Sequence, residues 1–321
     1  LGGTGVSRVG STDDYWRIWA RRHPDGTLVS VHRDASPWKW ETHPTSPYSM
    51  NPSGVSATWW SAGGATMSRV FAVGEGTPTT LMEYDPASST PWTAWAPPFG
   101  GDPPHYETLD GPVAAFTGLR AEGLLVRYHG AAVTTDDGEI YVFRVGGGDP
   151  GWEGPLGWGG YRSDVAPAVT VDPTEQIWSI FASREDGKVD LIRWQGGAWG
   201  TSTIDGPAGF NVCLSMAAAQ GQLSPSIYRI VLFCSTYDAS VPVVHYAYAK
   251  TADSKDFIWV TVPTTESITQ VYHNVGAVLR PDAMPGEYAI DGYAVSGSLV
   301  HVLTQGPTGD PITAAPFAMD D

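Results

Sequence analysis

The residues best suited to chemistry in this chain are arginines that recur in successive β-type segments. Arg17, Arg69, Arg127 and Arg229 occupy one place in a repeated pattern, and Glu83 lies in the β-type run that follows Arg69. A guanidinium and a carboxylate make charge-assisted hydrogen bonds, so together they can hold the carbonyl or hydroxyl oxygens of one ligand. The alternative is a structural arginine that lies over aromatic neighbours or pairs with a loop carboxylate.

Tryptophan forms the second group of candidates, because the chain holds 14 Trp and 14 Tyr. Most of these rings are expected to pack between sheets. Trp59 and Trp60 are adjacent, and successive side chains of a strand alternate, so one of them is expected to face a channel or rim pocket and line an apolar substrate site. Trp92, Trp95 and Trp152 are further candidates for the walls of a binding site.

Histidine supplies the remaining candidates. His245 falls on a third β-type run, as do His32 and His301, whereas His129 falls on a second run. A near-neutral imidazole can donate to a carbonyl or assist the loss of water, although a satisfied structural histidine is the alternative. The sequence has no HxH, HExxH or CxxC grouping, no GxSxG elbow, no P-loop and no GxGxxG leading into a helix, so neither a metal nor a cofactor is expected. A glycosidase pair of carboxylates stays open.

Short strands must position these side chains, because the chain is built from repeats. Residues 54–97 contain four β-type runs, at 55–60, 68–73, 80–85 and 92–95, separated by clusters of turn-forming Gly, Pro, Ser and Thr. One such unit cannot bury both of its faces, so it must stack against copies of itself. Comparable units span residues 5–44, 54–97, 112–155, 165–203, 211–263 and 274–319. The pattern predicts an all-β, six-bladed β-propeller with four antiparallel strands per blade, in a single domain over residues 1–321.

The net charge of the chain limits the classes of partner that it is expected to bind. A net charge of −16 argues against nucleic acid and against anionic membrane surfaces, since both attract basic patches. No apolar run approaches the length of a membrane span. A small molecule or a glycan is therefore the expected partner, and assembly into a homodimer is left open.

The two cysteines of the chain indicate the cellular compartment in which the protein is expected. Cys213 and Cys234 fall in the first two runs of the fifth unit, and a hairpin centred near residues 222–223 would place them side by side. A disulfide there would stabilise the fold by roughly 3 kcal/mol, with two buried free thiols as the alternative. The disulfide and the scarcity of lysine favour a secreted protein or one of the secretory pathway. The chain begins at Leu1 without Met, so we expect that it was processed or trimmed.

The unit at residues 54–97 resembles the repeat of the fungal fucose-specific lectins, which are six-bladed β-propellers. The likeness is carried by SRVFAV, TTLMEYD and the following Gly/Ser-Thr-Pro stretch with its Trp, and WRIWARRHPDGTLVSVHRD and QIWSIFASREDGKVDLIRW resemble the same repeat. In that family a sugar site lies between blades and uses an Arg of the second strand, a Glu of the third and aromatic groups of the adjoining blade. The resemblance implies a fucose-sized site made by Arg69, Glu83 and one of Trp92, Trp95 or Trp152.

The other units do not keep this pair of polar residues. The positions that correspond by sequence are Arg17 with Ser30, Arg127 with Val142, Ser179 with Leu191, Arg229 with His245, and Asp291 with His301. Only one pair of six is intact. A lectin of single weak sites needs several of them to gain useful avidity.

Because most of its lectin residues are missing, the chain resembles a second group with the same lectin-like fold. This group is the hetero-Diels–Alderases of fungal secondary metabolism. Those enzymes join a tropolone quinone methide to a terpene such as humulene. The similarity implies a cofactor-independent pericyclase for the biosynthesis of tropolone sesquiterpenoids, in which tryptophans shape the pocket and Arg69, Arg17, Arg229 or His245 donates a hydrogen bond to the heterodiene. The alternative is a secreted fucose-binding lectin with mostly degenerate sites, which binds a fucosylated glycan.

Overall fold

The computed structural model of the chain consists of β-strands and their connections. It describes residues 2–8, 16–22, 25–32, 39–62, 65–75, 79–98, 108–122, 124–147, 150–172, 176–206, 212–238, 241–251, 253–262, 275–281, 287–296, 299–306, 308 and 313–318. These residues contain 24 strands and no helix. None of them therefore belongs to a helix that is long and apolar enough to cross a membrane.

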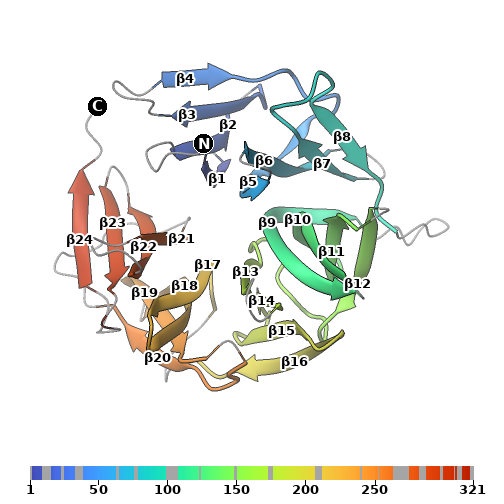
Figure 1. Cartoon of the computed structure of the whole chain (residues 1–321). Coiled ribbons are helices and arrows are strands. Elements are labelled where there is room, and N and C mark those ends of the chain that lie inside the picture. Colours follow the sequence, from blue (N-terminus) through green and yellow to red (C-terminus); the bar gives the residue numbers. More distant parts are fainter. Residues whose placement is uncertain are drawn as a thin grey trace. The chain divides into compact units, whose positions relative to one another are not determined.

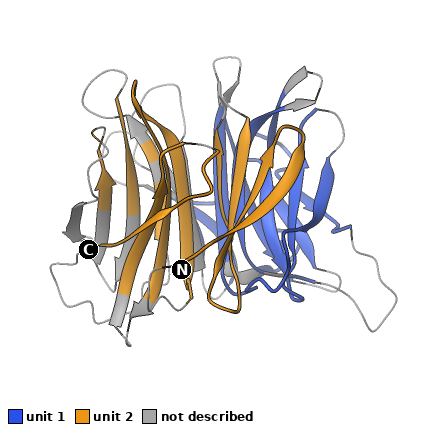
Figure 2. Ribbon diagram, turned by 90° about the horizontal axis from the view of Figure 1, so that it is seen from below, with its two compact units in different colours: residues 1–166 blue, residues 167–321 orange. Residues whose placement is uncertain are grey.

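The chain divides into two compact units, Leu1–Ala166 and Pro167–Asp321, which are coloured separately in Figure 2. The first unit holds three four-stranded sheets, and in each the strands pair in chain order (Figure 1). Its strands are β1 (Gly2–Arg8), β2 (Trp16–Arg21), β3 (Leu28–His32), β4 (Lys39–Thr42), β5 (Met50–Ala62), β6 (Ala65–Gly74), β7 (Thr80–Tyr84), β8 (Trp92–Trp95), β9 (Leu109–Glu122), β10 (Leu124–Thr135), β11 (Ile140–Val145) and β12 (Gly151–Leu156).

The second unit also holds three four-stranded sheets that pair in chain order. Its strands are β13 (Ala168–Asp172), β14 (Ile177–Ser183), β15 (Val189–Gln195), β16 (Ala198–Ile204), β17 (Ser215–Ser224), β18 (Ile227–Asp238), β19 (Val241–Ala249), β20 (Ile258–Thr261), β21 (Val275–Pro281), β22 (Tyr288–Ser296), β23 (Leu299–Gln305) and β24 (Thr313–Ala318). All pairings are antiparallel. The prediction of an all-β chain with six four-stranded antiparallel sheets is confirmed, whereas the single-domain boundary stays a prediction.

Glycine-containing turns set the length of the hairpins. Gly138 donates its backbone N–H to the carbonyl of Thr135 at 3.0 Å and has a φ of 75°, a conformation that favours glycine. A Cβ at this position would also lie 2.7 Å from the carbonyl oxygen of Tyr161. Gly187, with a φ of 87°, makes the corresponding bond to Arg184 in the turn between β14 and β15. The DG pairs of the sequence therefore close β-hairpins.

The hydrophobic core of the first unit lies between neighbouring sheets. One cluster joins Phe71 and Leu81, from β6 and β7, to Val133 and Phe143, from β10 and β11, and all four are at most 2% exposed. Burying one side chain of this size contributes about 1.5–3 kcal/mol. Because side chains alternate along a strand, Phe71 and the residue two positions before it, Arg69, lie on the same face of β6. The core thus fixes the position of the arginine.

A disulfide joins Cys213 to Cys234, with their Cα atoms 5.4 Å apart. The prediction of the bond is confirmed, but two details differ. Cys213 lies two residues before β17 instead of within the first strand of its sheet. The strands also reverse between Ser224 and Ile227, not near residues 222–223, because β17 contains a register shift just before the turn.

Candidate functional site

Arg69 and Glu83 form an ion pair in the first unit. Glu83 on β7 pairs with Phe71 on β6, and Arg69 reaches it diagonally, so that its Nε lies 3.1 Å from Glu83 Oε1. The side chains are only 12% and 9% exposed. The pair that the sequence predicted is therefore present, and it is largely buried.

Two further donors converge on Glu83. The indole Nε1 of Trp95, on β8, donates to Glu83 Oε2 at 2.8 Å, and His129 Nε2, on β10 of the next sheet, lies 3.0 Å from Glu83 Oε1. Burial on its own raises the pKa of Glu83, but the hydrogen bonds and charges of His129, Trp95 and Arg69 together outweigh burial and hold this pKa below its usual value. Glu83 is therefore a carboxylate at neutral pH.

Arg69 is held from three directions. Its Nη1 donates to the carbonyl oxygen of Ser68 at 2.7 Å, and its Nη2 lies 2.7 Å from Asp85 Oδ2. Its guanidinium also lies over the ring of Trp60, with Cζ 5.4 Å from the ring centroid, and Trp60 stacks on His129 at 4.7 Å. We call Trp60, Arg69, Glu83, Asp85, Trp95 and His129 the Arg69–Glu83 cluster.

The Arg69–Glu83 cluster keeps some capacity for hydrogen bonding. A guanidinium has five N–H groups, and Arg69 uses one on each of its three nitrogens, so one N–H remains on Nη1 and one on Nη2 without a partner among the described residues. Glu83 Oε2 accepts from Trp95 and has a second lone pair. Two donors beside one acceptor match the pattern of two neighbouring hydroxyl groups.

The predicted tryptophans divide between this cluster and its surroundings. Trp152 packs on Phe143 at 5.0 Å, and Phe143 packs on Trp95 at 4.9 Å, so Trp152 extends the aromatic surface next to the cluster. Trp92 lies outside it: its indole donates to the carbonyl of Pro44 at 2.8 Å and its ring packs on Tyr84. The indole of Trp152 makes the analogous bond to the carbonyl of Ala96.

The adjacent residues Trp59 and Trp60 lie on opposite faces of β5, as predicted from strand alternation. Trp60 is only 9% exposed because it is covered by His129 and Arg69, so it does not line an open apolar pocket. Trp59 is half-buried on the other face.

Arg229 and His245 do not form a pair, which corrects the sequence alignment. His245 lies opposite Cys234, five residues along β18 from Arg229, and its Nδ1 is 3.1 Å from Thr261 Oγ1. Arg229 lies opposite Gly221, donates to the carbonyl of Tyr228 at 2.8 Å and lies over the ring of Tyr248. Arg229 and His245 thus have the contacts of a structural arginine and a structural histidine, which were the alternative interpretations of these residues.

Two other predicted pairings are also wrong in register. Val142 lies opposite Ala132, whereas Arg127 is exposed and pairs with Leu119 on the other side of β10. Asp291 lies opposite Thr304, whose hydroxyl donates to it at 2.7 Å, while His301 lies opposite Ala294. Repeats that vary in length hide a shift of one or two residues, and such a shift changes every cross-strand partner.

In the first sheet, the place that corresponds to Glu83 is filled by other side chains of the protein. Ser30 lies opposite Trp19, two residues after Arg17, just as Glu83 lies opposite Phe71, two residues after Arg69, and Ser30 is 0% exposed. Its hydroxyl is 2.7 Å from His43 Nε2, and His43 Nδ1 is 3.1 Å from the hydroxyl of Tyr84. Arg17 lies on β2 opposite His32, and its side chain is outside the described residues. Ser30, His43 and Tyr84 are all buried.

Solved structures with the same fold include a fungal lectin from Aleuria aurantia and the protein AofleA from Arthrobotrys oligospora. The chain matches the Aleuria aurantia lectin, in its complex with Fucα1-6GlcNAc, with a TM-score of 0.61 and 12% identity, covering 97% of this chain and 94% of the lectin. It matches AofleA from Arthrobotrys oligospora with a TM-score of 0.63 and 11% identity, covering 100% and 88%. The Aleuria aurantia lectin is described as a six-bladed β-propeller with a novel mode of fucose recognition.

At these identities the likeness shows the fold, and the chain accordingly has the six-bladed β-propeller fold of the Aleuria aurantia lectin. No protein-family model matches the sequence, and no curated protein matches it either. Trp95 was one of the three tryptophans predicted beside the Arg69–Glu83 pair, and it contacts Glu83. His129 and Asp85, which complete the cluster, were not predicted as partners of this pair. Of these two, the sequence offers a signal only for Asp85, which stands two residues after Glu83 in the same repeat.

Proposed function

We propose that this chain is a carbohydrate-binding protein and that its site is the Arg69–Glu83 cluster. The observation that carries the proposal is the ion pair itself: a guanidinium and an ionised carboxylate on neighbouring strands, 3.1 Å apart, with bonding capacity left on both. In the proposed complex, the remaining N–H groups of Arg69 donate to sugar oxygens, and Glu83 Oε2 accepts from a sugar hydroxyl. Charge-assisted bonds of this kind are about twice as strong as neutral ones.

The proposed ligand is a fucosylated glycan. The support is the shared fold together with the ligand of the Aleuria aurantia lectin, which was solved with Fucα1-6GlcNAc and with α-methyl-L-fucoside. The half-buried rings of Trp95 and Trp152, which both pack on the buried Phe143, offer apolar faces beside the polar pair, and such faces suit the apolar side of a sugar ring. We also propose that the protein is secreted, which the disulfide Cys213–Cys234 supports.

A titration tests the proposal. α-Methyl-L-fucoside is added to the full chain and intrinsic Trp fluorescence is followed, because Trp95 donates to the carboxylate that accepts from the sugar. Saturation is expected in the millimolar range or below, and Arg69→Gln is expected to weaken it at least about tenfold through the loss of charge-assisted bonds. Arg229→Gln is the matched control, since Arg229 is also a second-strand arginine over an aromatic ring and has no part in the cluster. An unchanged response in Arg69→Gln would remove the proposal.

The cycloaddition hypothesis stays a prediction. It needs an open apolar pocket that holds two partners, and in the described part of the chain Trp60 is covered by His129 and Arg69. Arg229 and His245 are also separated on β18 and β19. Incubation with a quinone-methide precursor and humulene tests it: product formed at the rate and stereochemical ratio of a boiled control would end this hypothesis.

A further inference from the structure

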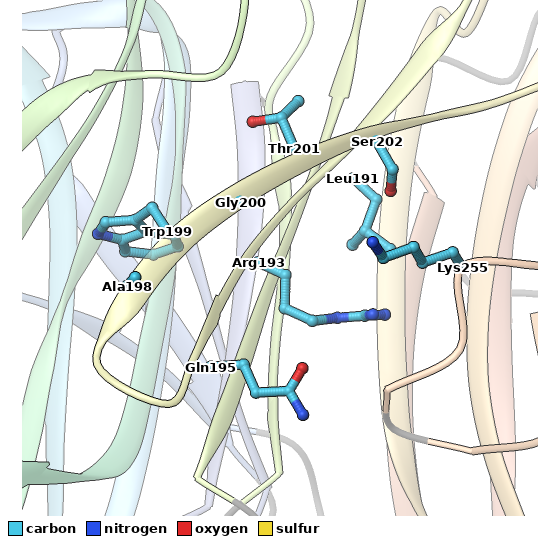
Figure 3. Close-up of a pocket in the computed structure, with 9 residues that line it drawn as sticks. All are labelled: Leu191, Arg193, Gln195, Ala198, Trp199, Gly200, Thr201, Ser202 and Lys255. Atoms are coloured by element: carbon cyan, nitrogen blue, oxygen red, sulfur yellow. The ribbon is translucent and has the colours of Figure 1, made fainter.

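A pocket of about 280 Å³ lies in the second unit, along β15 and β16 (Figure 3). It is lined by Leu191, Arg193, Gln195, Ala198, Trp199, Gly200, Thr201, Ser202 and Lys255. Its volume is slightly below the roughly 300–1,000 Å³ of most small-molecule sites, so it suits a ligand no larger than one monosaccharide. The sequence had suggested that this sheet lost its site, because Ser179 and Leu191 replace the arginine and the carboxylate.

Arg193 is the buried cation of this pocket. The residue is 7% exposed, and its Nη1 and Nη2 donate to the carbonyl oxygens of Asp253 and Ser254 at 2.8 and 2.7 Å. Burial lowers the pKa of Arg193, although the charges of Asp253 and Tyr228 act in the opposite direction. Among the described residues, no carboxylate oxygen lies within ion-pair distance of the guanidinium. A buried cation without a contacting anion is costly, so an anion that reached it would bind favourably.

Arg193 lines the pocket, and its guanidinium keeps unused hydrogen-bond donors. One N–H on each of its terminal nitrogens has no partner in the described part of the chain. Figure 3 shows the Arg193 side chain extending from β15 toward the segment that carries Lys255. Lys255 is exposed and supplies a second positive charge, and none of the nine lining residues is acidic. The lining of the pocket is therefore basic in a chain with a net charge of −16, although the charge of Asp253, which is not a lining residue, also acts on Arg193.

Gly200 leaves the space beside Arg193 open. The two residues are opposite each other on β16 and β15, and a Cβ built on Gly200 would meet no heavy atom within 4 Å. The same strand register places Ala198 opposite Gln195 and Ser202 opposite Leu191. Small side chains on one strand thus face long ones on the other, and this difference in size forms the hollow.

We propose that this pocket binds an acidic monosaccharide, with the carboxylate of the ligand between Arg193 and Lys255. The Ser202 hydroxyl and the Gln195 amide are available to the hydroxyl groups of the ring, and Leu191 provides an apolar contact. The chemistry of this site differs from that of the Arg69–Glu83 cluster, because its arginine stands on the third strand of its sheet and, among the described residues, no carboxylate is in ion-pair contact with it. A uronic acid fits these contacts better than a neutral sugar does.

Isothermal titration calorimetry on the full chain tests this proposal with glucuronate, glucose, acetate and sulfate as probes. Glucuronate is expected to bind at least about tenfold more tightly than glucose, because each charge-assisted bond is worth about a factor of ten in affinity. Acetate and sulfate are expected to bind more weakly than glucuronate, since they lack the hydroxyl groups. Equal affinity for glucose, or an affinity for sulfate as high as for glucuronate, would overturn the proposal.

Variants separate the pocket from a structural role of Arg193. Gly200→Leu fills the hollow without touching the contacts of Arg193, and it is expected to lower glucuronate affinity at least tenfold at an unchanged melting temperature. Gly151→Leu is the matched control, because Gly151 is also a strand glycine with no heavy atom within 4 Å of its virtual Cβ and it lies outside the pocket. Lys255→Gln is expected to lower the affinity about fivefold. Full glucuronate affinity in both Gly200→Leu and Lys255→Gln would refute the site.

Discussion

Replacing Glu83 by glutamine tests how the Arg69–Glu83 cluster is held together. The carboxylate accepts from Arg69 Nε at 3.1 Å, from Trp95 Nε1 at 2.8 Å and lies 3.0 Å from His129 Nε2. A glutamine has the same shape but only one acceptor oxygen, so its amide group must face one of these donors. Leaving a buried donor unsatisfied costs about 1–3 kcal/mol, and the charge on the acceptor is also lost.

The expected destabilisation of Glu83→Gln is about 3 kcal/mol. It falls at the lower end of the roughly 3–5 kcal/mol for breaking a buried ion pair, because Asp85 remains 2.7 Å from Arg69 and keeps a counter-charge. For a unit of the size of Leu1–Ala166, this corresponds to a fall in melting temperature of about 6–12 °C.

Differential scanning calorimetry measures this shift, with Glu139→Gln as the matched control. Glu139 accepts the hydroxyl of Tyr141 at 3.1 Å, and an amide oxygen can accept the same bond, so a change of at most about 2 °C is expected. If Glu83→Gln melted within 2 °C of the control, the donors around Glu83 would not depend on its charge and the reasoning would be refuted.

Three further predictions follow from local geometry. The pKa of Glu83 is lowered in the fold, so its contribution to stability is complete above its usual value of 4.5 and is lost as pH falls below it; in pH-dependent melting curves the wild type should lose this part and Glu83→Gln should not. Replacing Cys213 and Cys234 together by alanine should lower the free energy of unfolding, measured in urea, by about 3 kcal/mol. The reduced wild type, which lacks the same bond, should be as stable as this variant. Gly130→Ala places a Cβ 1.9 Å from a backbone carbonyl oxygen of β11 and should destabilise by about 3 kcal/mol, whereas Gly200→Ala, which meets no heavy atom within 4 Å, should be neutral; similar urea midpoints for the two would contradict this.

The sheets could be predicted because each one is encoded locally. Runs of β-forming residues end at Gly, Pro, Ser and Thr clusters, and the runs predicted at 55–60, 68–73, 80–85 and 92–95 coincide with β5 to β8 apart from their ends. Arg69 and Glu83 were found for the same reason, since both lie in one hairpin of one repeat.

The rest of the site depends on contacts that a single repeat does not encode. His129 reaches Glu83 from the next sheet, 46 residues away, and nothing in its own strand indicates that partner. The space beside Arg193 is open only because Gly200 stands opposite it, which requires the register of β15 and β16. The pairings of Arg229 with His245 and of Arg127 with Val142 failed because alignment of unequal repeats does not fix the register.

The central claim is that a sugar contacts Glu83, and the indole N–H of Trp95 reports on it directly, because both bind the same carboxylate oxygen. In ¹H–¹⁵N spectra of the full chain, titration with α-methyl-L-fucoside should shift the Trp95 indole resonance, assigned by Trp95→Phe, and should leave that of Trp199 in place. The shift should disappear in Arg69→Gln, which keeps Trp95 and Glu83 but removes the guanidinium. A Trp95 resonance that stays in place while fucoside binding is detected by calorimetry would contradict the account, since the sugar would then bind elsewhere.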